Sequence, residues 1–149
     1  MLTVFCSPSR YVQGKNATDA LADEMAKFGW SGKVMIIAGK SAAKLLGDSW
    51  QSNLPKAGFT VLIEKFSGEC STSEIDRLAQ VAAEQKVSVV VGAGGGKVLD
   101  TSRAVAARLD LPAVNCPTVA SSDAPCSALS VVYRENGEFD QYFFYKRNP

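Results

Sequence analysis

The segment from residue 87 to residue 104 has the composition of a turn that binds an anion. A β-branched run, Val87–Val91, is typical of a buried strand, and an amphipathic helix is expected after the glycines that follow it. Glycines between a strand and a helix let backbone N–H groups approach a ligand closely, and the helix N-terminus favours negative charge. A phosphate or pyrophosphate is the natural ligand. The residues predicted to hold it are Gly94, Gly95, Gly96 and Lys97.

Two better-known phosphate motifs do not fit this turn. The P-loop needs a glycine where this chain has Val91 and a hydroxyl where it has Val98. The Rossmann fingerprint counted from Gly92 needs a glycine where Lys97 stands. A tight strand-to-helix turn without a ligand is the other interpretation. Three consecutive glycines followed by a lysine favour an anion site of another type.

Composition limits the classes of function. The chain has 149 residues, 46% of them hydrophobic and 21% charged, which suits one globular domain with a substantial core. A net charge of +1 gives no basic surface for nucleic acid or for an anionic membrane. No apolar run approaches the ~20 residues of a membrane span. The N-terminus lacks the pattern of a signal peptide, so we expect a cytoplasmic protein.

The chain contains no histidine, and its cysteines have no metal-binding spacing. A Ser-His-Asp triad, a Cys-His pair and an imidazole metal site are therefore excluded for this chain alone. We predict no metal ligands here. The cysteines are interpreted as small buried hydrophobic residues, namely Cys6, Cys70, Cys116 and Cys126.

Apolar segments alternate with helical patterns along the chain. This alternation predicts a doubly wound, mostly parallel, Rossmann-like α/β sheet with helices on both faces. A capping box at Ser71 and Glu74 is expected to begin one helix, and Gly29 to stop another. The expected strands are Thr3–Cys6, Val34–Ala38, Phe59–Glu64, Val87–Val91 and Ala113–Cys116. The expected helices are Ala17–Phe28 with Leu21, Met25 and Phe28 on one face, one that carries Leu45, Leu46 and Trp50, one after Ser71, and one after the glycine turn.

The last part of the chain predicts a C-terminal β-hairpin. Leu129–Tyr133 and Gln141–Tyr145 flank Asn136-Gly137, a strong hairpin signal. In doubly wound sheets, ligands bind beyond the carboxyl ends of the strands. Gly39, the glycine turn and Thr118–Asp123 all follow predicted strands, so we expect them to face one crevice.

Two longer stretches, Gly94–Thr101 and Pro117–Tyr133, closely resemble the glycerol dehydrogenases of the iron-containing alcohol dehydrogenase group. Ser7–Gly14 and Gly68–Leu78 also resemble that family, so the likeness covers essentially the whole chain. It implies that residues 1–149 form an N-terminal NAD-binding domain. It also implies that the family's all-helical domain, which holds a divalent metal such as zinc, is absent from this chain.

The resemblance also assigns roles to single residues. It implies that Gly94–Lys97 bind the pyrophosphate of NAD and that Asp123 contacts a small polyol such as glycerol. From the residues alone, Asp123 is better explained as an Asx turn or a helix cap, and Asp100 as serving the helix dipole or ordering the turn. Further cofactor contacts are implied for Thr118, Ser121, Ser127, Leu129, Val131 and Tyr133. Alone, the hydroxyl residues would be turn formers and the tyrosine a strand aromatic.

One residue departs from the family pattern in a way that affects cofactor choice. Gly39, followed by Lys40, stands where glycerol dehydrogenases commonly have an aspartate that binds the adenosine ribose and repels a 2′-phosphate. The preference for NAD over NADP should therefore be weaker, although we still expect NAD to bind better.

Three functions are compatible with these features. The first is the cofactor-binding half of an NAD-dependent glycerol or polyol dehydrogenase whose metal is supplied by a missing helical domain; the expected partners are a separate helical-domain chain or further copies of this chain in a homo-oligomer. In such an enzyme the metal would activate the alcohol and hydride would pass to NAD. The second is a non-catalytic NAD(H)-binding module or a truncated remnant. The third is part of a dehydroquinate-synthase-like enzyme, which the Ser121–Ser127 motif disfavours.

Overall fold

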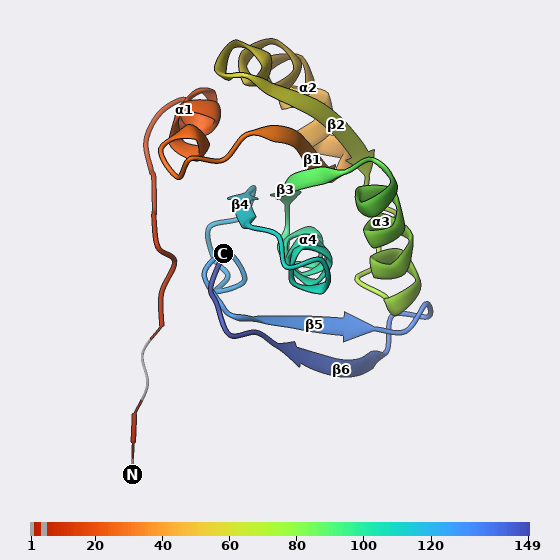
Figure 1. Cartoon of the computed structure of the whole chain (residues 1–149). Helices are drawn as coiled ribbons and strands as arrows, with labels where there is room; N and C mark the ends of the chain where they lie inside the picture. The colour runs from red at the N-terminus through yellow and green to blue at the C-terminus, as the bar shows by residue number, and fades with distance from the viewer. Residues whose placement is uncertain (1, 4–5) are drawn as a thin grey trace.

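Four strands of the chain form one parallel sheet. The computed structural model describes residues 2–3 and 6–149. Residues 34–38 and 89–94 are buried, and strands covered on both faces are expected to be β-branched throughout. The strand order across the sheet is β2 (Phe59–Lys65), β1 (Gly32–Ala38), β3 (Val87–Gly94) and β4 (Ala113–Pro117) (Figure 1).

Helices cover both faces of this sheet and form two separate cores with it. One face carries α1 (Leu21–Ala26) and α2 (Lys40–Asn53), together with 3-10 turns at Ala17–Ala20 and Leu54–Ala57, and the other carries α3 (Thr72–Glu84) and α4 (Gly96–Arg108).

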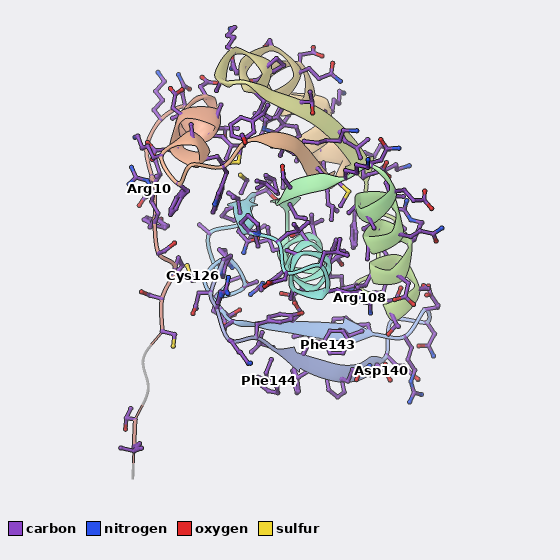
Figure 2. All side chains as sticks on the ribbon, in the orientation of Figure 1. Arg10, Arg108, Cys126, Asp140, Phe143 and Phe144 are labelled. Carbon is purple, nitrogen blue, oxygen red and sulfur yellow. The ribbon has the colours of Figure 1, made fainter. Side chains whose placement is uncertain are left out.

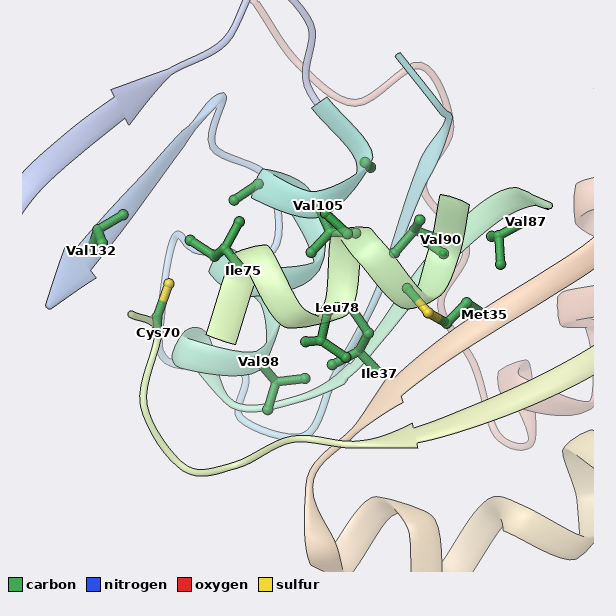
Figure 3. Close-up of a cluster of buried hydrophobic side chains, with 14 residues drawn as sticks. Met35, Ile37, Cys70, Ile75, Leu78, Val87, Val90, Val98, Val105 and Val132 are labelled. Atoms are coloured by element: carbon green, nitrogen blue, oxygen red, sulfur yellow. The ribbon is translucent and has the colours of Figure 1, made fainter. Parts of the chain in front are cut away.

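The residues of β1 alternate between the two cores. Met35 and Ile37 pack with Leu78 of α3 and Val105 of α4 (Figure 3), whereas Ile36 points into the core beneath α1 and α2. The helices that precede β2 lie on one face of the sheet and the helices that follow it lie on the other, so the chain changes face after β2. The neighbouring strands β1 and β3 meet at this change of winding direction, and such a switch point is where open α/β sheets bind ligands.

A C-terminal hairpin forms a separate two-stranded sheet. Strands β5 (Leu129–Tyr133) and β6 (Phe139–Phe144) pair antiparallel, and the hairpin packs against α4 on the side away from the parallel sheet (Figure 1). Phe143 packs against the core that contains residues of α4, whereas Phe144, labelled on the hairpin in Figure 2, is 76% exposed. As a result α4 is enclosed from two sides. Every residue from Val98 to Ala106 is buried, including the polar ones.

The predicted fold class is confirmed, and most element bounds agree within a few residues. The first helix is an exception, because α1 ends at Ala26. Phe28 lies beyond it, is 42% exposed and stacks on Trp30 at 4.6 Å between ring centres. The predicted extension of the helix to Phe28 is therefore wrong, although Phe28 still lines the same surface hollow as Leu21 and Met25. The expected strand Thr3–Cys6 falls partly outside the described residues, and β6 begins two residues earlier than predicted.

The helix start at Ser71 is confirmed in part. The N–H of Glu74 donates to Ser71 Oγ at 3.3 Å, as a capping box requires. The Glu74 carboxylate, however, accepts from the N–H of Ser67 at 3.0 Å and from Arg77 at 2.8 Å. It therefore ties α3 to the segment after β2 instead of to its own N-cap.

The cysteines divide into two groups. Cys70 is buried, and burial raises the pKa of its thiol to about 11; Cys116 is partly buried, and burial has the same effect there. Cys6 and Cys126 are exposed, so their predicted burial is wrong. No helix in the described part of the chain is long and apolar enough to cross a membrane.

Candidate functional site

The glycine turn is built by close packing and not by unusual backbone angles. Gly95 is the N-cap of α4 with φ −81° and ψ −179°, a conformation open to any residue, and neither Gly94 nor Gly96 has a positive φ. A Cβ added to Gly94 would lie 2.7 Å from Val98 Cγ2, and one added to Gly92 would lie 2.9 Å from Ser102 Cβ. Glycine is therefore required at these two positions so that β3 can lie directly against the start of α4.

The start of α4 presents unpaired donors to open space. The first N–H groups of a helix have no partner inside it, and no side chain in residues 2–3 and 6–149 caps this one. A Cβ added to Gly95 would meet no atom within 4 Å. Backbone donors at an open helix N-terminus suit the oxygens of a phosphate, so the turn fits the predicted ligand.

The ends of three strands meet at this turn. The N–H of Gly39, directly after β1, donates to the carbonyl of Ala93 at 2.9 Å, and the N–H of Thr118, after β4, donates to Gly94 at 3.0 Å. The structure therefore places Gly39, the glycine turn and the start of the 118–128 loop side by side. This is the arrangement that the sequence predicts for the crevice.

Lys97 has partners within the chain. Its ammonium lies 2.6 Å from Glu69 Oε2 and 4.9 Å from the centre of the Tyr133 ring, and its side chain is 48% exposed. Glu69 Oε1 also accepts from the N–H of Cys70 at 3.0 Å. The structure thus brings together two residues implied for the cofactor, Lys97 and Tyr133, and adds Glu69, which sequence reasoning missed.

Asp123 lies in the loop that runs past the turn. The neighbouring Ala124 Cβ would be 3.6 Å from a Cβ added to Gly96, so this part of the loop faces the start of α4. Asp123 is exposed, and its backbone carbonyl accepts from the N–H groups of Cys126 and Ser127. The side chain that accepts from the N–H of Ala124, at 3.2 Å, is that of Ser122. The structure therefore does not use the Asp123 carboxylate as a turn cap in the described part of the chain.

The remaining predicted cofactor residues have different surroundings. Ser121 is exposed, and Leu129 is partly buried at the start of β5. Ser127 and Val131 are both tied to α4. The hydroxyl of Ser127 accepts from Arg103 at 2.9 Å, and the N–H of Val131 donates to Asp100 Oδ2 at 3.0 Å.

Asp100 and Arg103 form an ion pair inside this assembly. Arg103 Nη2 lies 2.8 Å from Asp100 Oδ1, and the two side chains are 11% and 3% exposed for Asp100 and Arg103 respectively. Burial raises the pKa of the Asp100 carboxyl and lowers the pKa of the Arg103 guanidinium, because both charges are removed from water. The role expected for Asp100 at the helix dipole omitted this contact, and Arg103 was not predicted at all. The available signal was an acidic and a basic residue at spacing three in the middle of the predicted helix.

The residues of this chain do not fit a zinc site. Zinc in proteins is held by cysteine, histidine and carboxylate ligands, usually four in tetrahedral geometry or three with a water molecule. The chain has no histidine. Within the described residues, no three His, Cys, Asp or Glu side chains lie close enough together to hold a metal ion.

Comparison with known proteins assigns the family. The sequence profile named iron-containing alcohol dehydrogenase matches residues 8–149. The chain belongs to the iron-containing alcohol dehydrogenase family. It is 47% identical over 149 residues to a glycerol dehydrogenase of Thermotoga maritima, and 40% identical over 149 residues to a glycolaldehyde reductase of Halobacterium salinarum.

The solved structures agree with this family. A glycerol dehydrogenase of Schizosaccharomyces pombe superposes with a TM-score of 0.87 at 35% identity, over 98% of this chain and 36% of that one. The alignments to the Thermotoga and Halobacterium proteins cover all of this chain and 40% of each relative. The chain therefore spans about 40% of the length of these members of the iron-containing alcohol dehydrogenase family.

Proposed function

We propose that this chain is the NAD-binding domain of a polyol dehydrogenase. The observation that carries the proposal is the open N-terminus of α4 behind Gly94–Lys97, at the junction of β1, β3 and β4. A glycine turn of this kind receives a pyrophosphate through backbone N–H groups. Relatives at 47% and 46% identity carry the name glycerol dehydrogenase, which favours NAD and a small polyol over the dehydroquinate-synthase-like alternative.

The positions of the strand ends indicate where each part of NAD would lie. The pyrophosphate would lie on the N–H groups of Gly95, Gly96 and Lys97, and the adenosine ribose beside Gly39 at the end of β1. The nicotinamide half would then face the loop and strand that begin at Thr118. NAD supplies a hydride acceptor when it is bound. The chain supplies orientation and the charge that faces the phosphates.

Asp123 is the proposed polyol contact. Its carboxylate is exposed in the loop beside the start of α4. An ionised carboxylate is a pure acceptor with two oxygens, so it can receive two neighbouring hydroxyls of glycerol at once. Asp123 would therefore orient the polyol without exchanging a proton with it.

Alcohol oxidation also needs removal of the hydroxyl proton, and the described residues offer no metal site for that step. We propose that the metal is held by a helical domain outside these 149 residues. A non-catalytic NAD(H)-binding module would use the same turn, so binding alone does not separate the two functions.

One experiment tests the proposal in two stages. Calorimetric titration of the 149-residue chain with NAD is expected to show saturable one-to-one binding. Glycerol and zinc are then added to the NAD-loaded chain, and NADH absorbance is followed. We expect no NADH from the chain alone and steady NADH when a helical domain of a related glycerol dehydrogenase is supplied. Failure to bind NAD contradicts the proposal, and NAD binding that no helical domain converts into activity favours the non-catalytic module.

A further inference from the structure

A buried ion pair occupies the middle of α4. Arg103 and Asp100 lie one turn apart on the helix, 2.8 Å from each other, where α4 is enclosed by the parallel sheet and the hairpin (Figure 1). Taking two charges out of water costs about as much as their attraction returns, so such a pair adds little net stability. The role of this pair therefore lies in the hydrogen bonds that Arg103 and Asp100 make to other residues.

Those other bonds run to a single segment, residues 124–131. Arg103 Nη2 donates to the carbonyl of Ala124 at 2.7 Å, and Nη1 donates to both the carbonyl and the hydroxyl of Ser127. Asp100 accepts the N–H of Val131 through its second carboxylate oxygen at 3.0 Å. One guanidinium and one carboxylate thus fix three points of the same segment to α4.

The loop that leads into this segment carries Asp123. Residues 117–123 are all exposed, and the backbone carbonyl of Asp123 accepts from the N–H groups of Cys126 at 3.0 Å and Ser127 at 3.1 Å, which ties Asp123 to the following turn. The planar fork of Arg103 reaches both ends of that turn, at Ala124 and at Ser127. The turn that follows Asp123 is therefore held from two sides, by Arg103 on α4 and by Asn115 on β4, whose amide donates to the carbonyl of Pro125 at 2.9 Å.

The helix that carries this anchor also begins at the glycine turn. Gly96 is the first residue of α4, and Asp100 and Arg103 follow one and two turns later. We propose that Arg103, oriented by Asp100, is a positioning residue. It holds the 118–128 loop, which would face the nicotinamide half of NAD, at a fixed distance from the glycine turn. This role rests on the proposed NAD site. The Arg103 side chain is only 3% exposed, so its proposed role is to position the loop and not to bind the ligand directly.

The test compares two ligands, ADP and NAD, that would both bind their pyrophosphate at the glycine turn. ADP carries the adenosine and the pyrophosphate, whereas NAD adds the nicotinamide half that would face the anchored loop. In Arg103→Met we expect NAD affinity to fall at least about tenfold, because several charge-assisted bonds to the loop are lost. ADP affinity should change by less than about twofold. Partial unfolding would lower both affinities by the same factor, so the ratio of the two dissociation constants isolates positioning.

Two further variants complete the test. Arg108→Met removes an exposed arginine of the same helix, paired with Asp76 on the surface, and should leave both affinities unchanged (Figure 2). Arg103→Lys keeps the charge, but an ammonium cannot donate as a planar fork to Ala124 and Ser127 together. Arg103→Lys should therefore change the ratio of the NAD and ADP dissociation constants in the same direction as Arg103→Met. It also provides a second variant if Arg103→Met does not fold.

The outcomes are distinct. An unchanged ratio in the folded Arg103 variants, or loss of the fold in both of them, would overturn the positioning role and leave the proposed NAD site standing. A wild-type chain that binds ADP and NAD equally would overturn it as well, because the loop would then contribute nothing. A wild-type chain that binds neither ligand would remove the proposed function itself.

Discussion

The ammonium of Lys97 lies 2.6 Å from the carboxylate of Glu69, although the two residues are 28 positions apart in the sequence. The lysine that the glycine turn offers to a phosphate is therefore already neutralised by a carboxylate. A pyrophosphate at the turn and the Glu69 carboxylate would compete for the same cation. Substitutions at the two positions should accordingly change NAD affinity in opposite directions.

Lys97→Ala is expected to weaken NAD binding without unfolding the chain. A charge-assisted contact contributes ~1.5–3 kcal/mol, and loss of the Glu69 pair offsets part of it, so we expect about a tenfold loss of affinity. The side chain is 48% exposed, so little packing is lost. Calorimetric titration measures the effect, with Lys56→Ala as a control on the far side of the domain. Wild-type affinity in a folded Lys97→Ala variant would contradict the phosphate role.

Glu69→Gln is expected to tighten NAD binding. Glutamine can keep the bond from the N–H of Cys70 but no longer neutralises Lys97. Exposed ion pairs contribute up to about 1 kcal/mol, so affinity should rise by about two- to fivefold. The same titration measures it, at low salt where the effect is least screened. Weaker binding would mean that Glu69 orients the lysine for the cofactor instead of competing with it.

Cofactor choice should depend on residue 39. The wild-type chain is expected to prefer NAD modestly, because one lysine on a flexible stem is a weak site for a 2′-phosphate. A Cβ at Gly39 would make only ordinary contacts, 3.7 Å from Val98 Cγ2, so Gly39→Asp should fold normally. Its carboxylate should repel a 2′-phosphate and raise the preference for NAD by about tenfold or more. Paired titrations with NAD and NADP measure this ratio, and tighter NADP binding by the wild type would show that Lys40 dominates recognition.

The contribution of Glu74 to the stability of the fold should depend on pH. Burial alone would raise the pKa of its carboxyl, but hydrogen bonds from Arg77 and from the N–H of Ser67 outweigh burial and hold that pKa below its ordinary value of 4.5. A depressed pKa in the folded state contributes stability above the unfolded pKa, and this is lost as pH falls through the folded pKa. Glu74→Gln should therefore lower Tm at pH 7 by about 5 °C and by less as the pH drops below about 4.5. Thermal melts across this range check it, and a constant difference would show that ionisation of Glu74 is irrelevant.

The sheet and the turn were predictable because their signals are local. The apolar runs of β1 and β3 are buried, and Gly92 and Gly94 at the end of β3 are required by contacts with Ser102 and Val98 of the helix that follows directly. Local periodicity failed at Phe28, where the helix ends two residues earlier and a stacking contact with Trp30 takes over.

The missed site residues depend on contacts between distant segments. Nothing in the residues around Arg103 reveals that the hairpin covers α4, and only this cover buries the charge. Glu69 likewise meets Lys97 only because α3 and α4 pack side by side. The resemblance to the family named the residues proposed to contact the cofactor. The side chains that hold those residues in place came from the structure.

The central claim, that the open N-terminus of α4 is the NAD site, is tested most directly at Gly95. Its backbone angles suit any residue and a Cβ there meets no neighbour within 4 Å, so Gly95→Leu should fold with an unchanged Tm while its side chain fills the space proposed for the pyrophosphate. Calorimetric titration with NAD should show binding by the wild-type chain and at least about a hundredfold loss in Gly95→Leu, since both the anion contacts and the space for them are removed. Equal NAD affinity in the two folded proteins would contradict the account.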